Sequence, residues 1–312
     1  MNASESLHLF DLNAWTTRQL ARVEQALSRW VAVSSDSPVA DGVLGLEQAM
    51  RYAVLDGGKR LRPLLVLAAC EAVNGDERTA LRAACAVELI HAYSLVHDDM
   101  PCMDNDVLRR GKPTVHVQFG QAQALLAGDA LQALAFEILT PEGDEVPPAR
   151  QARLCRLLAQ AAGYQGMAGG QAIDLASVGL PLTSAELHDM HRLKTGALLQ
   201  ASVMMGAACG SVPAQVEDAL KQYGAAVGLA FQVVDDVLDV TADSATLGKT
   251  AGKDAAQDKP TFVSLLGLPA AQAYADQLLA QALNSVNSIP TQGLPRTAAL
   301  QALARLLVQR TH

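Results

Sequence analysis

Apolar residues recur at helical spacing, at i, i+3, i+4 and i+7, along almost the whole chain. This spacing predicts helices at residues 131–139, 153–162, 185–208 and 216–240. Residues 81–97 are apolar on most faces of a helix, which is typical of a helix buried at the centre of a fold. No stretch alternates apolar and polar residues as a half-buried strand would. The pattern therefore predicts an all-α protein.

Turn-forming residues group between the predicted helices. Thr183 and Glu186 have the spacing of a capping box, which predicts that a helix begins there. The break at 241–260 is polar, rich in Gly and Lys, and longer than a simple connection needs, so we expect it to act as a lid over a site. None of the breaks has the length or composition of an interdomain linker. Residues 1–312 are therefore predicted to form a single domain.

Composition supports this interpretation and excludes some partners. Hydrophobic residues make up 50% of the 312 residues and aromatics only 4%, a balance that favours helices over sheets. The net charge is −8 and no basic tract is present, which argues against nucleic acid as a partner.

The first residues lack the basic and apolar regions of a signal peptide. The longest apolar stretch, 197–209, is interrupted and too short to span a bilayer, so we expect a cytoplasmic protein without membrane insertion.

The cysteines point to the same compartment. Their number is odd, no CxxC pair occurs, and most lie within Ala-rich apolar stretches. Buried free thiols in a reducing cytosol are the expected state of the set Cys70, Cys85, Cys102, Cys155 and Cys209. His188 and His191, in HDMH, have the spacing of a metal-binding pair but no third ligand motif. We interpret them as part of a solvated helix face.

Two groups of aspartates carry the strongest functional signal. They are Asp98, Asp99 and Asp104 in VHDDMPCMDND, and Asp235, Asp236 and Asp239 in QVVDDVLDV. Neighbouring carboxylates packed among apolar residues repel one another and are costly to desolvate unless cations compensate. Oxygen-only sites of this kind suit Mg²⁺, which often shares its remaining positions with substrate phosphates. The sequence therefore predicts a metal-bridged diphosphate site.

Helical geometry places each group. Asp235, Asp236 and Asp239 stand at i, i+1 and i+4, within an arc of about 100° on one helix face. Asp98 and Asp104 would lie about 120° apart on a continuous helix. Pro101 disfavours such a helix. We therefore expect Asp98 and Asp99 to form the last turn of a helix and a loop to return Asp104 to the site.

Several motifs occur in the order seen in the trans-isoprenyl diphosphate synthases, a family that the chain resembles over about residues 40–310. They are GGKRLRP at 57–63, DDMPCMD at 98–104, RRGKPT at 109–114, GD at 128–129, GGQAIDL at 169–175, KTG at 194–196 and FQVVDDVLD at 231–239. The resemblance implies an antiparallel helical bundle around a deep central cavity and a homodimer. It also implies head-to-tail condensation of an allylic diphosphate with isopentenyl diphosphate, helped by about three Mg²⁺ ions.

The resemblance assigns roles to individual residues. Asp98, Asp104 and Asp235 resemble the direct Mg²⁺ ligands, and Asp99, Asp236 and Asp239 resemble supporting or water-mediated ligands. Isopentenyl diphosphate would be anchored by Lys59, Arg62, His91 and Arg110. The allylic diphosphate would meet Arg109, Lys194, Lys249 and Lys259, with Thr195 and Gln232 beside the substrate. Arginine suits a diphosphate because its planar fork donates two parallel hydrogen bonds.

Product length would be set by residues one helical turn before Asp98. Tyr93 and Ser94 stand there, and an aromatic residue at this position resembles the members that produce farnesyl diphosphate. Three alternatives stay open. One is a geranylgeranyl diphosphate synthase of the same family, one is a terpene cyclase, and one is an inactive partner subunit. The intact DDVLD and GGKRLRP motifs argue against the last two.

Overall fold

The structure is a computed structural model that describes residues 10–32, 41–55, 57–180, 182–241, 261–289 and 296–308. Its first half contains α2 (Leu12–Trp30), α3 (Asp41–Val54), α4 (Leu61–Ala72), α5 (Glu77–Asp98), β1 (Leu108–Arg109), β2 (Lys112–Pro113), α6 (Val115–Phe119), α7 (Gln121–Leu139) and α8 (Pro148–Ala162). Its second half contains α9 (Met167–Ala176), α10 (Ser184–His191), η1 (Arg192–Gly196), α11 (Ala197–Ala208), α12 (Ala214–Thr241), α15 (Phe262–Leu266), α16 (Leu268–Asn287) and α17 (Ala298–Val308).

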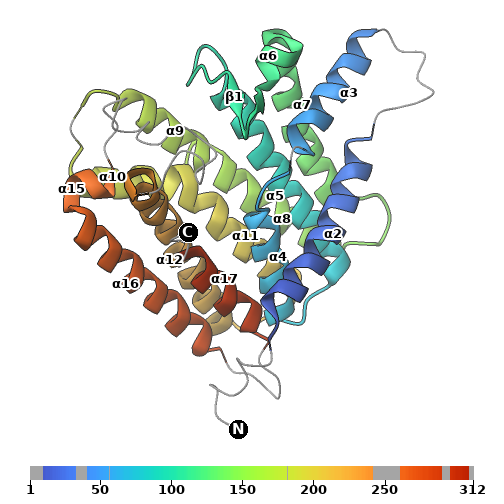
Figure 1. Ribbon diagram of the computed structural model, residues 1–312. Helices are drawn as coiled ribbons and strands as arrows, with labels where there is room; N and C mark the ends of the chain where they lie inside the picture. Colours follow the sequence, from blue (N-terminus) through green and yellow to red (C-terminus); the bar gives the residue numbers. More distant parts are fainter. Residues whose placement is uncertain are drawn as a thin grey trace.

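The fold is all-α, as the apolar pattern predicts, and α5 lies in its interior (Figure 1). The helix is lined on several faces by fully buried residues, including Val87, Leu89 and Ile90. It packs against α4, α7 and α11. Burying apolar side chains on several faces stabilises the bundle at about 25 cal/mol for each Å² removed from water. The prediction of a central buried helix at 81–97 is confirmed.

Small residues let the central helices approach closely. A Cβ atom at Gly206 of α11 would overlap the backbone of Val66 in α4, and one at Gly228 of α12 would lie 2.9 Å from Gly196. Larger side chains at these positions would force the helices apart. The glycines therefore fix where α11 crosses α4 and where η1, which carries the KTG motif, approaches α12.

Helix starts differ from the expected ones where the pattern is weak. The helix expected at 131–139 begins at Gln121, because Gly128 packs against the ring of His97 and does not break α7. The helix expected at 153–162 begins at Pro148. The capping box of Thr183 and Glu186 is present, with both reciprocal hydrogen bonds. The expected helix at 185–208 is interrupted by the π-helical segment η1, and a two-residue antiparallel hairpin, β1–β2, was not predicted.

Two helices, α5 and α7, are long and apolar enough to cross a bilayer by length and composition, so the expectation that no segment reaches that length was wrong. The two helices pack against each other, and 67% of the apolar window in α5 is buried inside the bundle. Interhelical packing accounts for the apolar character of α5.

Among the cysteines, Cys70, Cys85 and Cys209 are buried free thiols as expected, whereas Cys102 is exposed.

Candidate active site

The first aspartate group lies where α5 ends. Asp98 is its last residue and Asp99 its C-cap. The following loop folds back, because the backbone N–H of Asp104 donates to the carbonyl of Asp98 at 2.8 Å and that of Asn105 donates to Met100 at 3.1 Å. Asn105 has a φ of 52°, in the left-handed region that asparagine tolerates. The predicted geometry, with Asp104 returned by a loop, is confirmed.

The environment of Asp98 favours a bound cation. The pKa of its carboxyl is raised from 3.8 to about 6, chiefly by burial; the carboxylates of Asp104 and Asp99 also act to raise it, and Lys194 and Arg109 act to lower it. A carboxylate that is costly to ionise alone becomes easy to ionise beside a metal ion. The donor set of Asp98 and Asp104 therefore fits Mg²⁺.

Arg109 holds the second aspartate of this group. Its guanidinium binds Asp99 with both arms of its fork, through Nε at 2.8 Å from Oδ2 and Nη2 at 2.6 Å from Oδ1. Burial raises the pKa of the Asp99 carboxyl, and the hydrogen bonds from Arg109 oppose that rise. Arg109 thus lies beside the first aspartate group. Its Nε and Nη2 atoms are already engaged by Asp99.

The second aspartate group divides between two environments. Asp236 is buried and accepts two hydrogen bonds, from Nε2 of Gln232 at 2.9 Å and from the backbone N–H of Phe262 at 2.8 Å. It thereby ties α12 to the start of α15. Asp239 is also buried, whereas Asp235 is more accessible. Of the three, Asp235 is therefore the one whose position best suits an ion from solvent.

Lys194 projects from the π-helical segment η1. Its ammonium is 2.6 Å from Oδ2 of Asp174 on α9, and its charge acts on Asp98 as well. Gly170 permits this arrangement, because a Cβ atom there would overlap the backbone of Lys194. The next residue, Thr195, donates its hydroxyl to Oε1 of Gln232 at 3.1 Å. π-Helical turns frequently occur at functional sites, and this one aims Lys194 between two carboxylates.

A buried arginine, Arg60, anchors the GGKRLRP loop to neighbouring helices. Arg60, with a φ of 46°, binds Glu24 at 2.6 Å and Glu88 at 2.8 Å, and donates to the carbonyl of Val54 at 2.7 Å. Breaking a buried ion pair of this kind costs about 3–5 kcal/mol. Arg60 therefore fixes the loop that carries its neighbours Lys59 and Arg62.

The hairpin motif RRG meets this loop. The guanidinium of Arg110 donates to the carbonyl of Gly57. Gly58 has a φ of 132°, and a Cβ atom there would lie 2.9 Å from the Arg110 guanidinium, so only glycine fits. Two motifs about fifty residues apart in the chain are thus brought together, as their shared assignment to one diphosphate requires.

Cations concentrate around His91. Burial lowers the pKa of its imidazole well below 6.5, and Arg62, Arg110, Arg109 and Arg60 lower it further. Burial also lowers the pKa of Arg62, whose Nε has no hydrogen-bond partner among the described residues. A neutral histidine within a group of arginines leaves a region that an anion would stabilise.

One cavity of about 370 Å³ joins most of these elements. Of the predicted site residues, it is lined by Arg62, His91, Tyr93, Ser94, Asp98, Lys194 and Thr195. Its apolar lining includes Met103, Met167 and Leu175. The ring of Tyr93 lies 5.7 Å from that of His97, one turn further along α5. The cavity combines a carboxylate end, a cationic side and an apolar wall.

Sequence reasoning missed several residues of this region. Gln171 lines the cavity, is 8% exposed, and has neither side-chain polar atom hydrogen-bonded among the described residues. Asp174, three residues later, holds Lys194. Both belong to GGQAIDL, where their i, i+3 spacing on a helix was the available signal.

The interpretation of His191 as solvated was wrong, because its ring is buried and packs 5.3 Å from that of Phe262. Lys249 and Lys259 lie outside the described residues.

No group of three or more His, Cys, Asp or Glu side chains within the described residues is close enough to hold one metal ion by itself. The carboxylates at the end of α5 and on α12 are therefore partial ligand sets. Mg²⁺ commonly binds through one or two carboxylates, with waters and substrate phosphates completing its octahedron. The donor sets fit an ion that arrives with a diphosphate.

Comparison with known proteins places these features in a family. Residues 44–291 match the family description "Polyprenyl synthetase". The chain belongs to the polyprenyl synthetase family. It is 43% identical over 296 residues to farnesyl diphosphate synthase from Haemophilus influenzae, covering 94% of this chain and 98% of that protein. It is 47% identical over 272 residues to the large subunit 1 of a heterodimeric geranylgeranyl pyrophosphate synthase from Arabidopsis thaliana, covering 86% and 72%.

Polyprenyl synthetases of known structure share the fold. The crystal structure of geranyltransferase from Helicobacter pylori, complexed with magnesium and isoprenyl diphosphate, superposes with a TM-score of 0.82 at 35% identity. The match covers 96% of this chain and 98% of that chain. Membership of this family confirms the resemblance inferred from the ordered motifs.

Proposed function

We propose that the protein is a Mg²⁺-dependent trans-prenyltransferase that joins isopentenyl diphosphate head-to-tail to dimethylallyl and then geranyl diphosphate, releasing farnesyl diphosphate and diphosphate. The observation that carries this proposal is the single cavity shared by Asp98, Lys194, Arg62, His91 and Tyr93. It offers the Asp98 carboxylate for a metal ion, Arg62 and Lys194 for two diphosphates, and an apolar wall for a hydrocarbon chain. Farnesyl diphosphate synthases are among the relatives at 43% identity.

The reaction breaks the C–O bond of the allylic diphosphate, and the diphosphate leaves with the electron pair. The π electrons of isopentenyl diphosphate then form the new C–C bond to the allylic cation, and the released diphosphate accepts the proton lost from the carbon adjacent to the new cationic centre. Mg²⁺, when bound, supplies the positive charge that stabilises the departing diphosphate. Lys194, held by Asp174, and Arg109, held by Asp99, add fixed positive charge on the same side.

The opposite side of the cavity binds the second substrate. Arg62, Arg110 and Lys59 hold the diphosphate of isopentenyl diphosphate, and neutral His91 donates or accepts a hydrogen bond without adding charge. Thr195 and Gln232, which are joined by a hydrogen bond from the Thr195 hydroxyl to the side-chain oxygen of Gln232, stand beside the substrate. The apolar lining excludes water, which would otherwise capture the allylic cation. Tyr93 closes the space into which the growing chain extends.

Two further assignments complete the proposal. We place the protein in the cytoplasm as one catalytic domain. A homodimer would cover the outer face of α7, where Leu125 and Leu126 are 48% and 50% exposed beside the smaller Ala122 and Ala133. An exposed apolar stripe of this kind on one helix is typical of an interface between subunits. The Mg²⁺ requirement of about three ions per site is part of the same proposal.

A geranylgeranyl diphosphate synthase is the second candidate, favoured by the 47% identity to the plant large subunit. One experiment tests both candidates. The purified protein is incubated with isopentenyl diphosphate, geranyl diphosphate and Mg²⁺, and the dephosphorylated products are separated by chromatography. The proposal expects farnesol as the main product. Geranylgeraniol as the main product would favour the second candidate, and no elongation at all would overturn both.

A further inference from the structure

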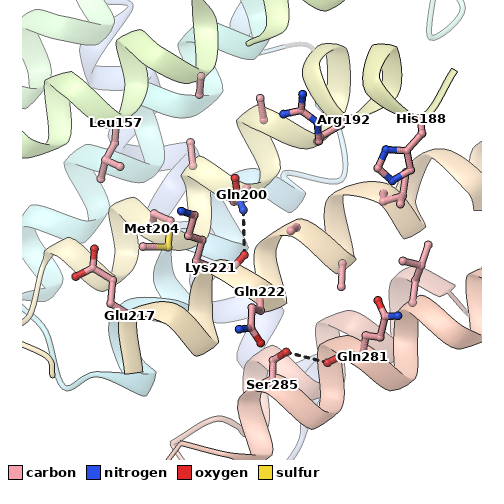
Figure 2. A pocket seen from close by; sticks show the side chains of 18 of the residues that line it. Leu157, His188, Arg192, Gln200, Met204, Glu217, Lys221, Gln222, Gln281 and Ser285 are labelled. Carbon is pink, nitrogen blue, oxygen red and sulfur yellow. Dashed lines mark hydrogen bonds between the residues drawn. The ribbon is translucent and has the colours of Figure 1, made fainter. Parts of the chain in front are cut away.

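A second and larger cavity lies apart from the aspartate site. It has a volume of about 1130 Å³ and is bounded by α8, η1, α11, α12 and α16 (Figure 2). It arises because α8 packs on α11 and α16 packs on α12, while the surface between them carries small side chains. We call it the α12 groove. None of the residues assigned above to catalysis or to either substrate lines it.

Part of the lining of the α12 groove is apolar and rich in alanine, and we call this part its floor. It includes Ala197 and Ala201 of α11 and Ala225, Ala226 and Leu229 of α12. Ala225 is exposed in the middle of a 28-residue helix, so its surface is open to a ligand. An unbranched hydrocarbon chain matches such an alanine-lined surface, because it makes continuous contact without needing deep side pockets.

Positive charge gathers along the wall. Arg192 of η1 and Lys221 of α12 both line the groove, and Figure 2 shows Lys221 beside Gln200 of α11. Arg192 uses only its Nε for Asp189, at 3.1 Å. The one acidic lining residue, Glu217, is already paired with Arg153 at 2.8 Å. The whole protein has a net charge of −8, so this local excess of cations stands out from the rest of the chain. It is complementary to an anionic head group.

Uncharged donors continue the polar rim. Gln222, Gln281 and Asn284 line the groove, and their side chains make no hydrogen bond within the described part of the chain. They can serve the oxygens of a phosphate or carboxylate. The combination of an apolar floor and a cationic and amide rim is that of a site for a linear amphipathic anion.

We propose that the α12 groove is a second ligand site, which binds a linear hydrocarbon chain carrying an anionic head, with the chain on the alanine floor and the head at Lys221 and Arg192. Alkyl or prenyl phosphates and fatty acids share this chemistry. The groove is also adjacent to the aspartate site. Gly196 and Leu229, which line it, are one residue and three residues from Thr195 and Gln232, whose hydrogen bond borders the catalytic cavity.

Binding is tested without metal or substrate, so the result does not depend on the proposed function. Dodecyl phosphate, below its micelle concentration and in EDTA, is titrated into the protein by calorimetry, with laurate as the carboxylate arm. Inorganic phosphate and dodecanol are the controls that lack the chain or the charge. We expect saturable binding of dodecyl phosphate or laurate and none of either control. The tighter of the two names the head group.

Three variants locate the site. Lys221→Glu and Ala225→Trp should each weaken binding by about tenfold or more, because one reverses a charge and the other fills the floor. Arg29→Glu makes the same charge change at an exposed position on α2 and should leave binding unchanged. Melting temperatures within a few degrees of wild type establish that the variants are folded. Absence of binding, or binding that Lys221→Glu and Ala225→Trp leave intact while Arg62→Ala removes it, would overturn the proposal.

A kinetic arm tests the link to the catalytic cavity and rests on the proposed function. Saturating dodecyl phosphate should raise the KM for geranyl diphosphate in wild type by about threefold or more, and this effect should be absent in Lys221→Glu. Simple competition at the catalytic cavity would persist in Lys221→Glu and would contradict the coupling.

Discussion

The ammonium of Lys194 lies 2.6 Å from a carboxylate oxygen of Asp174, which joins the KTG motif to the GGQAIDL motif. The same lysine acts electrostatically on Asp98. Asp174 therefore holds the lysine near Asp98. A partly buried charge pair with one good hydrogen bond restricts the lysine to a small region of space.

Removing this restraint should affect the allylic substrate selectively. Asp174→Ala should raise the KM for geranyl diphosphate and lower kcat, together reducing kcat/KM by about 10- to 100-fold, while the KM for isopentenyl diphosphate stays within about twofold. Asp174→Asn keeps an oxygen acceptor and should recover part of the loss. Steady-state kinetics with each substrate varied in turn provide the measurement. Equal damage to both substrates would indicate a general structural role for Asp174.

The two diphosphate sites should separate by mutation. Arg62→Ala should mainly raise the KM for isopentenyl diphosphate, by about tenfold or more, because it removes a buried cation from the group around His91. Lys194→Ala should mainly change the kinetics of the allylic substrate. An Arg62→Ala enzyme with unchanged isopentenyl diphosphate kinetics would refute the assignment of that site.

The raised pKa of Asp98 predicts how stability depends on pH without metal. Its carboxyl has a pKa of about 6 in the folded protein and 3.8 as the ordinary value, so the folded state holds the proton more tightly. The stability that this group contributes is fully present below about pH 4 and is lost as pH rises through about 6. In EDTA, wild type should therefore lose melting temperature relative to Asp98→Asn between pH 4 and pH 7. A difference between the two proteins that stays constant over this range would contradict the assigned environment.

Tyr93 should limit the length of the product. Tyr93→Ala opens the cavity beside His97 and should shift the main product from C15 toward C20 or longer, whereas Tyr93→Phe keeps the ring and should retain C15. Because Tyr93 is only half-buried, its truncation should cost less than the ~3–5 kcal/mol typical of buried aromatics. Chromatography of dephosphorylated products gives the answer. A folded, active Tyr93→Ala enzyme that still stops at C15 would assign the limit to another residue.

Much of the fold followed from local pattern. The buried helix α5 and the loop that returns Asp104 were predictable, because apolar periodicity and a proline act within a few residues. Features that depend on a distant partner were not. The π-helical turn at Lys194 packs against Gly170 of another helix, and Gly128 of α7 leaves room for the ring of His97. His191 appeared solvated for the same reason, since Phe262, which covers it, lies 71 positions later.

Within the site, too, some residues could be predicted from the sequence and others could not. Residues that bind charged ligands stand in recognisable motifs, so Asp98, Arg62 and Lys194 could be named from the sequence. Residues that position them, such as Asp174 and Glu88, are ordinary acids until their partners are seen. The segment 242–260, with Lys249 and Lys259, lies outside the described residues, so its expected role as a lid stays a prediction.

The most direct test of the central claim is turnover of isopentenyl and geranyl diphosphate with and without divalent metal. We predict that EDTA abolishes product formation and that excess Mg²⁺ restores it. Asp98→Ala and Asp235→Ala should lose on the order of 10³-fold or more in kcat with Mg²⁺ present, while keeping the wild-type circular dichroism spectrum. Full activity in EDTA, or an Asp98→Ala enzyme as active as wild type, would contradict the account of the two aspartate groups as metal-bearing partners of the diphosphate.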